Sequence, residues 1–416
     1  MRILWITNIL FPEVNALISE ERQLKSSGGW MISLAKEITK LPDIKLSVAT
    51  VSNKVKSFNI SKGKYITYYT IPYGKGNTKY NKEYEVYWKK IKKMFNPDIV
   101  HIHGTEFTHG LAYINACGNE RVVISIQGLK SGIAPFYLAG LNWKDIYGNL
   151  TFHDIIKGNL YHEQRAFCKT GEFEREAIKK VKHIIGRTSW DRAHIWTINP
   201  YAQYYICNEI LREEFYDGTT WSYEKCTPYT IFLSQGNYPL KGLHQLLKAM
   251  PLILKHYPDT TIRIAGGDIT HSSGISGLIH FTGYGKIIKQ LIKKYHLKKN
   301  ITFLGPLNAE EMKREYLRSN VFVCPSSIEN SPNSLGEAQI LGVPCVAASV
   351  GGVPDFMIND SKHMYRFEEL NIMAQMVCHI FSLKGNIDNN IVRKTAMDRH
   401  NIDNNIKQLL YIYNSL

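Results

Sequence analysis

The sequence predicts an α/β protein with two successive α/β domains, and three observations support that fold class. The chain has 416 residues, which is more than one hydrophobic core usually serves. Short apolar runs alternate with helical patterns in two separate series, which is typical of mainly parallel sheets. Between the two series, residues 215–220 are polar and rich in turn formers, so we place the domain boundary there.

The first series occupies the amino-terminal half of the chain. Its apolar runs predict buried strands, and several of the stretches between them have helical character. The expected strands are Ile3–Ile6, Leu46–Val51, Ile66–Ile71, Ile99–His103, Val122–Ile126, His183–Arg187 and Tyr204–Cys207. The expected helices are Trp30–Thr39, Lys82–Phe95, Phe107–Cys117 and a long region from about Phe152 to Lys182.

The second series repeats this alternation. The expected strands are Tyr229–Leu233, Thr261–Ala265, Ile301–Phe303, Val321–Cys324 and Pro344–Ala348. The expected helices are Leu243–His256, Lys286–Tyr295, Ala309–Ser319 and Asn333–Leu341. We therefore expect domains at residues 1–218 and 219–395, followed by a terminal helix within residues 396–416. Ligands of such sheets bind at the carboxyl ends of the parallel strands.

Composition narrows the cellular setting. No apolar run approaches the roughly 18 residues that a membrane span needs, and the first apolar run is too short for a signal peptide. The seven cysteines are scattered and form no Cys-x-x-Cys pair, which favours reduced thiols in a cytoplasm and argues against structural zinc. We therefore expect a cytoplasmic protein, with a peripheral position on the inner face of the cell membrane as an open alternative.

The chain is strongly basic, with a formal net charge of +15 at pH 7. Such a charge calls for an anionic partner, and nucleic acid, lipid headgroups and phosphorylated substrates all qualify. No DNA- or RNA-binding signature accompanies the lysines, so we expect no nucleic acid. Because the lysines are dispersed along the chain, an ordinary solvated surface stays open as the alternative.

Two glutamates eight positions apart, Glu329 and Glu337, flank the start of a predicted helix. An apolar run before Glu329 predicts a buried strand, and Asn330 or Ser331 is the expected N-cap with Pro332 as the first helical residue. The start of such a helix attracts phosphate. Glu337, about a turn and a half into the helix, can accept hydrogen bonds from a ribose diol. Two solvated glutamates beside a well-capped helix are the alternative.

The residues that follow this pair carry a family resemblance. Residues 329–337, followed by 342–348 and 351–355, resemble the signature of the retaining glycosyltransferases of family four, which have the GT-B fold. The resemblance implies two Rossmann-like domains that face a central cleft and a C-terminal helix that crosses back to the first domain. Asp355 stands where the family usually has glutamate.

The resemblance also implies roles for individual residues. Glu329 would lie near the transferred sugar, and Glu337 would bind the ribose of a nucleotide-sugar donor. The backbone between them would contact the donor diphosphate, and this segment consists of Ser331, Pro332, Asn333, Ser334 and Leu335.

Two glycine-containing segments are similar to the phosphate-contacting loops of the family. Gly28-Gly29 precedes a predicted helix and would line the donor diphosphate, although a plain turn is the alternative. Lys241-Gly242 matches a family lysine that reaches the donor phosphates, but Gly236 or Asn237 stands where the family has an arginine. A hydrogen bond to a charged group is worth roughly 1.5–3 kcal/mol, so either another basic residue replaces the arginine or lysine acts alone.

Two further candidates stand at strand ends. His103 and His101 share one face of a strand in a segment that resembles the family's Asp-Ile-Val-His-x-His stretch, and we expect His101 to be a hydrogen-bonded core residue. Gln127 stands where many family members have a histidine, so it can contact a sugar hydroxyl but cannot shuttle a proton. We carry His103 and Gln127 as catalytic candidates together with Glu329 and Lys241.

Residues 131–143 are apolar, aromatic and punctuated by glycine. A packed loop fits this composition, and so does an acceptor or membrane-interface loop, since amphipathic aromatic residues suit the depth of lipid headgroups. Lysines nearby would suit a lipid-linked acceptor.

We predict a retaining hexosyltransferase that moves a sugar from a nucleoside-diphosphate donor to a glycan or lipid-linked acceptor. The resemblance favours cell-surface polysaccharide or lipopolysaccharide synthesis, with association with an anionic membrane as an option. The chain has no Asp-x-Asp triplet and no Gly-x-Gly-x-x-Gly, so we expect no metal and no cofactor besides the donor. The alternatives are a GT-B epimerase or phosphorylase, and a basic nucleic-acid-binding protein.

Overall fold

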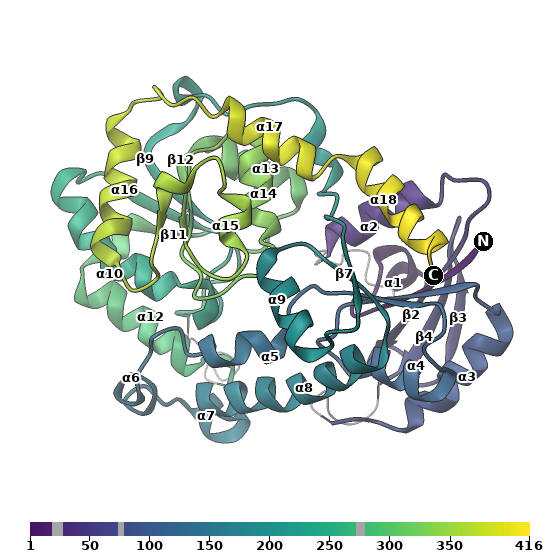
Figure 1. Cartoon of the computed structure of the whole chain (residues 1–416). Coiled ribbons are helices and arrows are strands. Elements are labelled where there is room, and N and C mark those ends of the chain that lie inside the picture. The colour runs from purple at the N-terminus through teal and green to yellow at the C-terminus, as the bar shows by residue number, and fades with distance from the viewer. Residues whose placement is uncertain (19–27, 74–78, 272–278) are drawn as a thin grey trace. The chain divides into compact units, whose positions relative to one another are not determined.

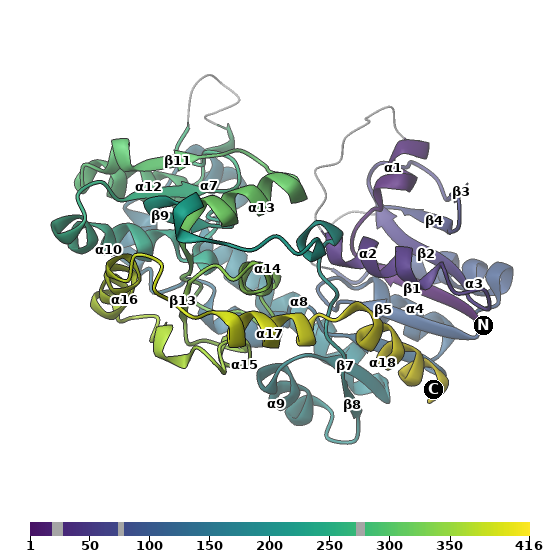
Figure 2. The same ribbon diagram turned by 90° about the horizontal axis from the view of Figure 1, so that it is seen from above.

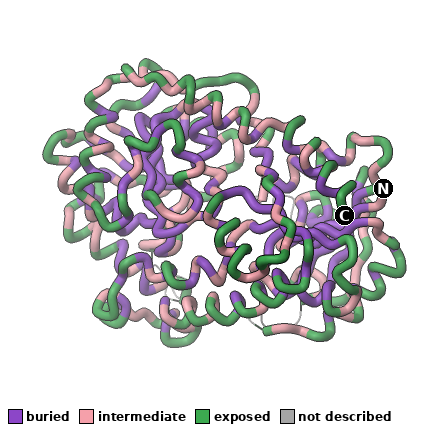
Figure 3. The backbone as a smooth tube through the Cα atoms, viewed as in Figure 1, coloured by how far each residue is buried: buried purple, intermediate pink, exposed green. Residues whose placement is uncertain are grey.

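The structure is a computed structural model and describes residues 1–18, 28–73, 79–271 and 279–416. The described residues form two compact units, each with its own β-sheet (Figure 1). Unit 1 comprises Met1–Ala134, Ala166–Leu211 and His400–Leu416, and unit 2 comprises Pro135–Arg165 and Arg212–Arg399. In both units the central strands are buried while the helices carry much of the exposed surface, which confirms the predicted α/β class (Figure 3).

Unit 1 has an eight-stranded sheet in the order β3-β4-β2-β1-β5-β6-β7-β8. Neighbouring strands are parallel except β3, which pairs antiparallel with β4 at the edge. The strands are β1 (Arg2–Thr7), β2 (Lys45–Ser52), β3 (Asn59–Lys62), β4 (Thr67–Pro72), β5 (Ile99–His103), β6 (Val122–Ser125), β7 (His183–Gly186) and β8 (Gln203–Ile206). All the predicted strands of this half are present. The edge strand β3 was not predicted, because its partly exposed residues form no apolar run.

Helices cover both faces of this sheet. They are α1 (Pro12–Ile18), α2 (Gly29–Ile38), α3 (Glu83–Phe95), α4 (His109–Cys117), α5 (Lys130–Ile133), α8 (Leu160–Lys180), α9 (Ser189–Ile198) and α18 (Ile402–Asn414). Helix α8 belongs to this unit from Ala166 onward, and its first residues group with unit 2. The period of β1 explains the two cores beneath them, because alternate residues of a strand point to opposite faces. Leu4 and Ile6 join one apolar cluster, whereas Ile3 and Trp5 join the other.

The terminal helix α18 packs on unit 1 beside α2 (Figures 1 and 2). Tyr413 on α18 accepts a hydrogen bond from Trp5 Nε1 at 3.0 Å, and its hydroxyl lies 2.7 Å from His101 Nδ1. The other ring nitrogen of His101 lies 2.6 Å from Ser125 Oγ. His101 is therefore the hydrogen-bonded core histidine that the sequence predicts, and the last helix returns to the first unit as expected.

Unit 2 has a parallel six-stranded sheet in the order β11-β10-β9-β12-β13-β14. Its strands are β9 (Thr227–Leu233), β10 (Thr261–Ile264), β11 (Ile301–Phe303), β12 (Ser319–Cys324), β13 (Cys345–Ala348) and β14 (Met364–Tyr365). All the predicted strands of this half are present, and only the short edge strand β14 was not predicted. Parallel strands buried on both faces explain why their sequences are nearly continuous apolar runs.

Most helices of unit 2 connect these strands. They are α10 (Leu243–His256), α12 (Gly283–Lys294), α13 (Ala309–Arg318), α14 (Asn333–Leu341), α15 (Val353–Phe356), α16 (Leu370–Ser382) and α17 (Asn390–Arg399). Short 3₁₀ turns are η2 (Glu213–Tyr216), η3 (Tyr223–Lys225), η4 (Pro239–Lys241), η5 (Leu297–Asn300) and η6 (Ser361–His363), while η1 (Ala134–Phe136) stands where the chain first enters unit 2. Over the described ranges, no helix combines the length and the apolar character of a membrane span.

Residues 135–165, which include α6 (Trp143–Tyr147) and α7 (Phe152–Lys157), group with unit 2. This differs from the expected first-domain range 1–218, and α17 likewise keeps the first part of the expected range 396–416 in unit 2. Three hydrogen bonds hold the segment there: His244 Nε2 with the Ala139 carbonyl at 2.9 Å, Gly283 N–H with Asp154 Oδ1 at 3.2 Å, and Ser327 Oγ with the Phe136 carbonyl at 3.1 Å. Such contacts join residues far apart in sequence, so composition does not reveal them.

Candidate functional site

Two loops of unit 2 meet at the point where the order of its strands reverses. The chain leaves β9 toward β10 on one side, and it returns to β12 on the other side of β9. Such a switch point leaves a crevice at the carboxyl ends of the strands, where ligands of open α/β sheets bind. Lys241 lies in the loop after β9 and Glu329 in the loop after β12. Lys241 Nζ lies 2.6 Å from Glu329 Oε1, so the topology pairs these two predicted site residues.

The Lys241–Glu329 ion pair is largely screened from water. The side chains are 23% and 14% exposed, and Ser326 Oγ donates a second hydrogen bond to Glu329 Oε1 at 2.7 Å. Burial opposes the charge on Lys241, but the Glu329 carboxylate and Tyr238 outweigh it and raise the pKa of Lys241 above its ordinary value. The site therefore keeps a fixed ammonium group at neutral pH.

Glycines explain how the two loops approach each other. Gly242 has a left-handed backbone (φ +71°), and a Cβ on it would lie 1.7 Å from the Pro325 carbonyl oxygen. Gly351 also has a positive φ (+52°), and a Cβ on it would lie 2.0 Å from the Glu329 carbonyl oxygen. Gly352 N–H donates to that same carbonyl at 3.0 Å. The Lys-Gly and Gly-Gly motifs thus fix the backbone on both sides of the ion pair.

Helix α14 begins three residues after Asn330, with its positive end in the Glu329 loop. The expected cap is wrong: Pro332 itself is the N-cap, and no side chain caps the helix. The reason is that Pro332 keeps an extended backbone (ψ 98°), while its carbonyl already accepts from Leu335 N–H at 2.9 Å. The residues predicted to contact a diphosphate form this terminus, and Pro332 and Leu335 among them are buried, while Ser331, Asn333 and Ser334 are half-buried.

Glu337 lies in the second turn of α14 and is only 5% exposed. Its carboxylate accepts two hydrogen bonds from Arg212, from Nε to Oε1 and from a terminal nitrogen to Oε2, each at 2.8 Å. Tyr316 lies with its hydroxyl 3.4 Å from Oε2 and donates to the Ser334 carbonyl at 2.9 Å. The alternative of a solvated surface glutamate is therefore wrong for Glu337.

Arg212 is the functional candidate that the sequence did not reveal. Burial alone would lower its pKa, but the Glu337 carboxylate reverses that effect and raises it, so the guanidinium is permanently charged. Its position has no motif around it and its partner is 125 residues away, so only the fold brings the two together. Neither candidate for the family arginine position offers such a group. Gly236 is buried, and a Cβ there would lie 2.9 Å from Leu243 Cδ2, while Asn237 is exposed and carries no charge.

Unit 1 has its own switch point, between β1 and β5. Glu106, just after β5, accepts a hydrogen bond from Asn8 Nδ2 at 2.8 Å and one from Gly128 N–H at 2.7 Å. Burial raises the pKa of the Glu106 carboxyl, although the Gly128 N–H and nearby Lys130 act in the opposite direction. No signal in the sequence pointed to Glu106.

His103 ends β5 in the core of unit 1 and is 1% exposed. Its ring stacks on His101 at 3.7 Å and meets the Trp5 ring edge-on at 4.5 Å, so the two histidines share one face as predicted. Among the described residues, neither ring nitrogen of His103 has a hydrogen-bond partner. Burial, His101 and nearby Arg187 hold its pKa well below the ordinary value, so the ring is neutral. It cannot act as an imidazolium acid at neutral pH.

The remaining candidates of unit 1 also stand at strand or helix ends. Gln127 follows β6 and is half-buried. Gly28 has a left-handed backbone (φ +77°) as the N-cap of α2, and a Cβ on it would lie 2.4 Å from Ile9 Cδ1. Gly29 is the first residue of that helix, so the pair opens a helix as expected.

A buried carboxyl supports this part of unit 1. Glu174 on α8 accepts hydrogen bonds from Lys130 N–H, Ser131 N–H, Ser131 Oγ and Thr105 Oγ1, at 2.7 to 3.0 Å. Burial raises its pKa to about 7 despite these donors. In the parts of the chain that the structure describes, no group of three or more His, Cys, Asp or Glu side chains is placed to hold a metal ion.

The comparisons with known proteins bear on unit 2 first. Residues 222–373 match the family model of glycosyl transferases group 1, and this range contains Lys241, Glu329 and Glu337. A D-inositol 3-phosphate glycosyltransferase from Corynebacterium urealyticum is 35% identical over 116 residues. That alignment covers 27% of this chain and 25% of the relative, so the chain spans a quarter of that relative's length.

Solved structures resemble the fold of the whole chain. Sucrose-phosphate synthase from Thermosynechococcus elongatus superposes with a TM-score of 0.71 at 14% identity, covering 100% of this chain and 98% of the other. Anabaena HepE, solved in complex with UDP and glucose, has a TM-score of 0.67 at 13% identity with full coverage of both chains. The chain therefore has the two-domain α/β fold known as GT-B, and its residues 222–373 are similar to the group 1 glycosyl transferases.

Proposed function

We propose that this protein is a retaining glycosyltransferase of family four that moves a hexose-type sugar from a nucleoside-diphosphate donor to a glycan or lipid-linked acceptor. The observation that carries the proposal is the Lys241–Glu329 ion pair at the switch point of a domain similar to the group 1 glycosyl transferases. A half-buried ammonium group beside a helix N-terminus suits a diphosphate leaving group. The UDP and glucose bound by HepE support a nucleotide-sugar donor.

Lys241 can serve Glu329 and a phosphate together. An ammonium group has three N–H donors, and Glu329 accepts one of them at 2.6 Å. The positive end of α14 adds a contribution of roughly 0.3–1 kcal/mol when exposed and up to about 2 when partly buried. These two groups would neutralise the departing diphosphate, while Glu329, held by Lys241 and Ser326, would orient the sugar.

Glu337 would bind the ribose of the donor with help from Arg212. A carboxylate offers about four acceptor sites. Two take the Arg212 N–H groups, and the one proton of the Tyr316 hydroxyl goes to the nearer Ser334 carbonyl, so acceptor sites remain for a ribose hydroxyl. Arg212 would thus orient Glu337, and it would bring to this helix the second cation that the family arginine position lacks.

Unit 1 would serve the acceptor side. Gln127 would contact sugar hydroxyls, Gly28 and Gly29 would line the diphosphate, and His103, being neutral, would act as a hydrogen-bonding group rather than as an acid. No protein base is needed if the departing phosphate itself takes the proton of the attacking hydroxyl. Because Lys241 and the start of α14 would carry the diphosphate charge and the chain has no Asp-x-Asp triplet, we propose a metal-independent reaction. A cytoplasmic site of action, cell-surface polysaccharide or lipopolysaccharide synthesis, and contact with the inner face of an anionic membrane complete the proposal.

A donor panel tests the proposal. UDP-, GDP-, ADP- and dTDP-sugars are scored by thermal stabilisation of the whole chain and by release of the nucleoside diphosphate. We expect one donor class to raise Tm, and Glu337→Ala to weaken its binding by more than about threefold, a cost above about 0.7 kcal/mol. A matched control is Glu310→Ala, a glutamate in the first turn of α13.

Three results would contradict the proposal. Stabilisation by none of the donors would remove the nucleotide-sugar site. Epimerisation of the donor without an acceptor, or dependence on free phosphate, would indicate an epimerase or a phosphorylase. Steeply salt-dependent binding to DNA or RNA, without donor binding, would indicate a nucleic-acid-binding protein.

A further inference from the structure

Residues 135–165 present a concentration of exposed apolar side chains on α6 and α7. Trp143, Tyr147, Phe152, Ile155 and Ile156 are between 55% and 75% exposed. Single exposed apolar residues are ordinary on a protein surface, but several within two adjoining short helices mark a contact surface. We call these five residues the apolar patch.

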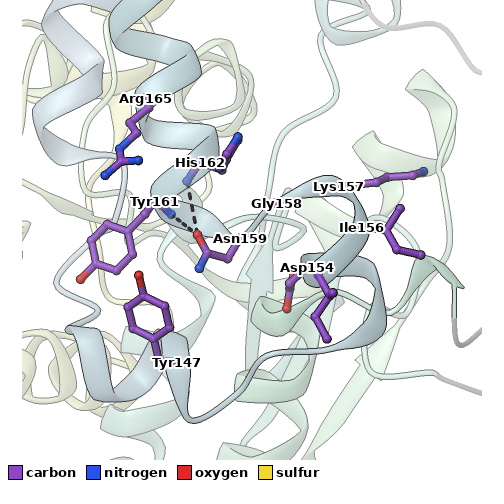
Figure 4. Close-up of a pocket in the computed structure, with 10 residues that line it drawn as sticks. Tyr147, Asp154, Ile156, Lys157, Gly158, Asn159, Tyr161, His162 and Arg165 are labelled. Atoms are coloured by element: carbon purple, nitrogen blue, oxygen red, sulfur yellow. Dashed lines mark hydrogen bonds between the residues drawn. The ribbon is translucent and has the colours of Figure 1, made fainter.

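A pocket of about 500 Å³ adjoins the apolar patch (Figure 4). Its lining includes the apolar side chains of Tyr147, Ile155 and Ile156 and the basic ones of Lys157, His162 and Arg165. One acidic residue, Asp154, also lines it, and its carboxylate accepts hydrogen bonds from the Gly283 and Thr151 N–H groups. The floor is ordered by stacking and hydrogen bonds, since Tyr147 stacks on Tyr161 at 5.8 Å and Asn159 Oδ1 accepts from Tyr161 N–H at 3.1 Å. An anionic group could therefore lie beside apolar chains.

The exposed charges of residues 135–165 have one sign. Within residues 135–165, the exposed side chains that can carry charge are all basic, namely Lys144, Lys157, His162 and Arg165. The acidic residues of the segment accept hydrogen bonds from the protein itself. Asp145 caps α6, Asp154 accepts from Gly283 N–H, and Glu163 accepts from the Tyr137 hydroxyl at 2.6 Å. The surface therefore suits a partner that has negatively charged groups next to an apolar layer.

Several hydrogen bonds hold residues 135–165 to the rest of unit 2. Besides the hydrogen bonds of Ala139, Phe136 and Asp154, the Leu150 carbonyl accepts from Lys286 Nζ at 3.3 Å. Both short helices also have complete capping boxes, at Asn142 and Thr151. The exposure of the apolar patch therefore results from a well-held backbone and not from a loose loop that could fold inward.

We propose that the apolar patch and the adjoining basic pocket dock this protein onto an anionic phospholipid bilayer. The aromatic and branched side chains enter the headgroup layer, where Trp and Tyr are favoured, while Lys144, Lys157 and Arg165 meet lipid phosphates. The inference deepens the proposed function by assigning its membrane contact to a surface, and it rests on that proposal only for the choice of partner.

Vesicle binding of the full chain tests the proposal without any donor present. We expect sedimentation with phosphatidylglycerol–phosphatidylethanolamine vesicles and little with phosphatidylcholine alone. Ile155→Asn/Ile156→Asn should lower the partition coefficient at least about tenfold. The matched control, Ile358→Asn/Ile391→Asn, changes two isoleucines of unit 2 that are 68% and 64% exposed, and it should leave partition within about twofold.

Two further measurements separate charge from apolar contact. Lys144→Gln/Lys157→Gln should weaken partition about fivefold for each lysine removed, whereas the exposed pair Lys298→Gln/Lys299→Gln should not. Tryptophan emission of the wild-type chain should shift to shorter wavelength on vesicles, and Trp143→Phe should abolish the shift. This readout keeps the test decisive even if a double variant fails to fold.

Several outcomes would overturn the proposal. These are an absence of vesicle binding, equal binding by the patch and control variants, or an emission shift that persists in Trp143→Phe. Light scattering that shows a dimer in solution, broken by Ile155→Asn/Ile156→Asn, would make the patch a contact between copies of the chain. Donor binding measured without vesicles stands apart: its failure would remove the proposed transferase and leave the vesicle result intact.

Discussion

The two units place a carboxylate at the same point of their sheets, and they surround it with different charges. Glu329 at the switch point of unit 2 meets the ammonium group of Lys241 at 2.6 Å. Glu106 at the switch point of unit 1 accepts hydrogen bonds from two neutral donors of the described residues, Asn8 Nδ2 and the Gly128 N–H, and the charge of Lys130 lies farther away. One unit holds a salt bridge where the other holds a hydrogen-bonded carboxyl with a raised pKa.

The contrast extends to the neighbouring residues. Unit 2 adds a second fixed cation, Arg212, and the positive end of α14. Unit 1 adds a neutral histidine, His103, and a second carboxyl with a raised pKa, Glu174. Fixed cations favour a charged ligand such as a diphosphate, whereas neutral donors and acceptors favour the hydroxyl groups of a sugar. The same fold thus presents two chemically different strand edges.

The largest effect is expected from removing the Lys241 ammonium group, which distinguishes unit 2 from unit 1. Lys241→Met takes away the cation proposed to meet the leaving diphosphate, and it leaves the largely screened Glu329 carboxylate without its partner. We expect kcat/KM to fall about 10²- to 10³-fold, as for the loss of one preorganised donor to a developing anion. Steady-state kinetics with the donor that the panel identifies would measure this.

Lys298→Met serves as the control for Lys241→Met, because Lys298 is an exposed lysine of the same unit. It should change kcat/KM by less than about threefold, since exposed charges contribute little. Comparable losses in both variants would mean that Lys241 has no special position in the reaction.

The raised pKa of Glu174 should give unit 1 a pH dependence. The native carboxyl binds its proton up to about pH 7, whereas the unfolded chain releases it near pH 4.5. The native state therefore binds more protons in that window, and the free energy of unfolding should fall as pH rises from about 4.5 to about 7, by up to about 3 kcal/mol. Above pH 8 this contribution should be constant.

Urea unfolding of wild type and Glu174→Gln at several pH values measures the contribution of Glu174. The difference between the two unfolding free energies should move in favour of the variant between pH 5 and pH 7. A difference that is flat over this range would show that Glu174 titrates alike in both states.

Much of the scaffold behind this comparison could be predicted from the sequence. Strands such as Ile99–His103 are apolar runs that parallel sheets bury on both faces, so their positions were predicted directly. The meeting of Lys241 with Glu329 also follows from sequence logic, since both residues follow strands whose carboxyl ends share one sheet edge. The Lys-Gly and Gly-Gly motifs were predicted as family matches, and the close approaches that they allow were seen only in the fold.

Other parts of the site depend on contacts between distant residues. Arg212 lies in a connection without periodicity or motif, so nothing local indicated its hydrogen bonds to Glu337. The placement of residues 135–165 on unit 2 rests on single hydrogen bonds such as that between His244 and Ala139. The N-cap of α14 was predicted one or two residues too early, because residue preferences do not report the extended backbone of Pro332.

A smaller effect is expected from breaking the Arg212–Glu337 ion pair of unit 2. Breaking a buried ion pair costs about 3–5 kcal/mol, and the 18% exposure of the Arg212 side chain reduces our expectation for Arg212→Leu to about 2 kcal/mol. Because unit 2 has the size of an ordinary domain, Tm should fall by about 4–8 °C in calorimetry. Donor binding should weaken as well, since Glu337 loses its orientation.

The double variant Arg212→Leu/Glu337→Gln tests the pairing itself. Its loss of stability should be smaller than the sum of the two single losses, because each single change leaves a charged partner without its counterpart. Additive losses would show that the two side chains contribute independently.

The smallest effect is expected from Glu106→Gln, the counterpart of the charge removal in unit 2. A neutral amide resembles the protonated carboxyl that the raised pKa of Glu106 favours, and it retains one oxygen for either Asn8 or Gly128. The cost should be one neutral hydrogen bond, about 1 kcal/mol in urea unfolding. Donor binding should change little, because Lys241 and Arg212, the cations proposed to act on the donor, both lie in unit 2. If Glu106→Gln lowered donor affinity as much as Lys241→Met does, Glu106 would have to act as a charged group. The proposed difference in charge between the carboxyl ends of the two sheets would then be wrong.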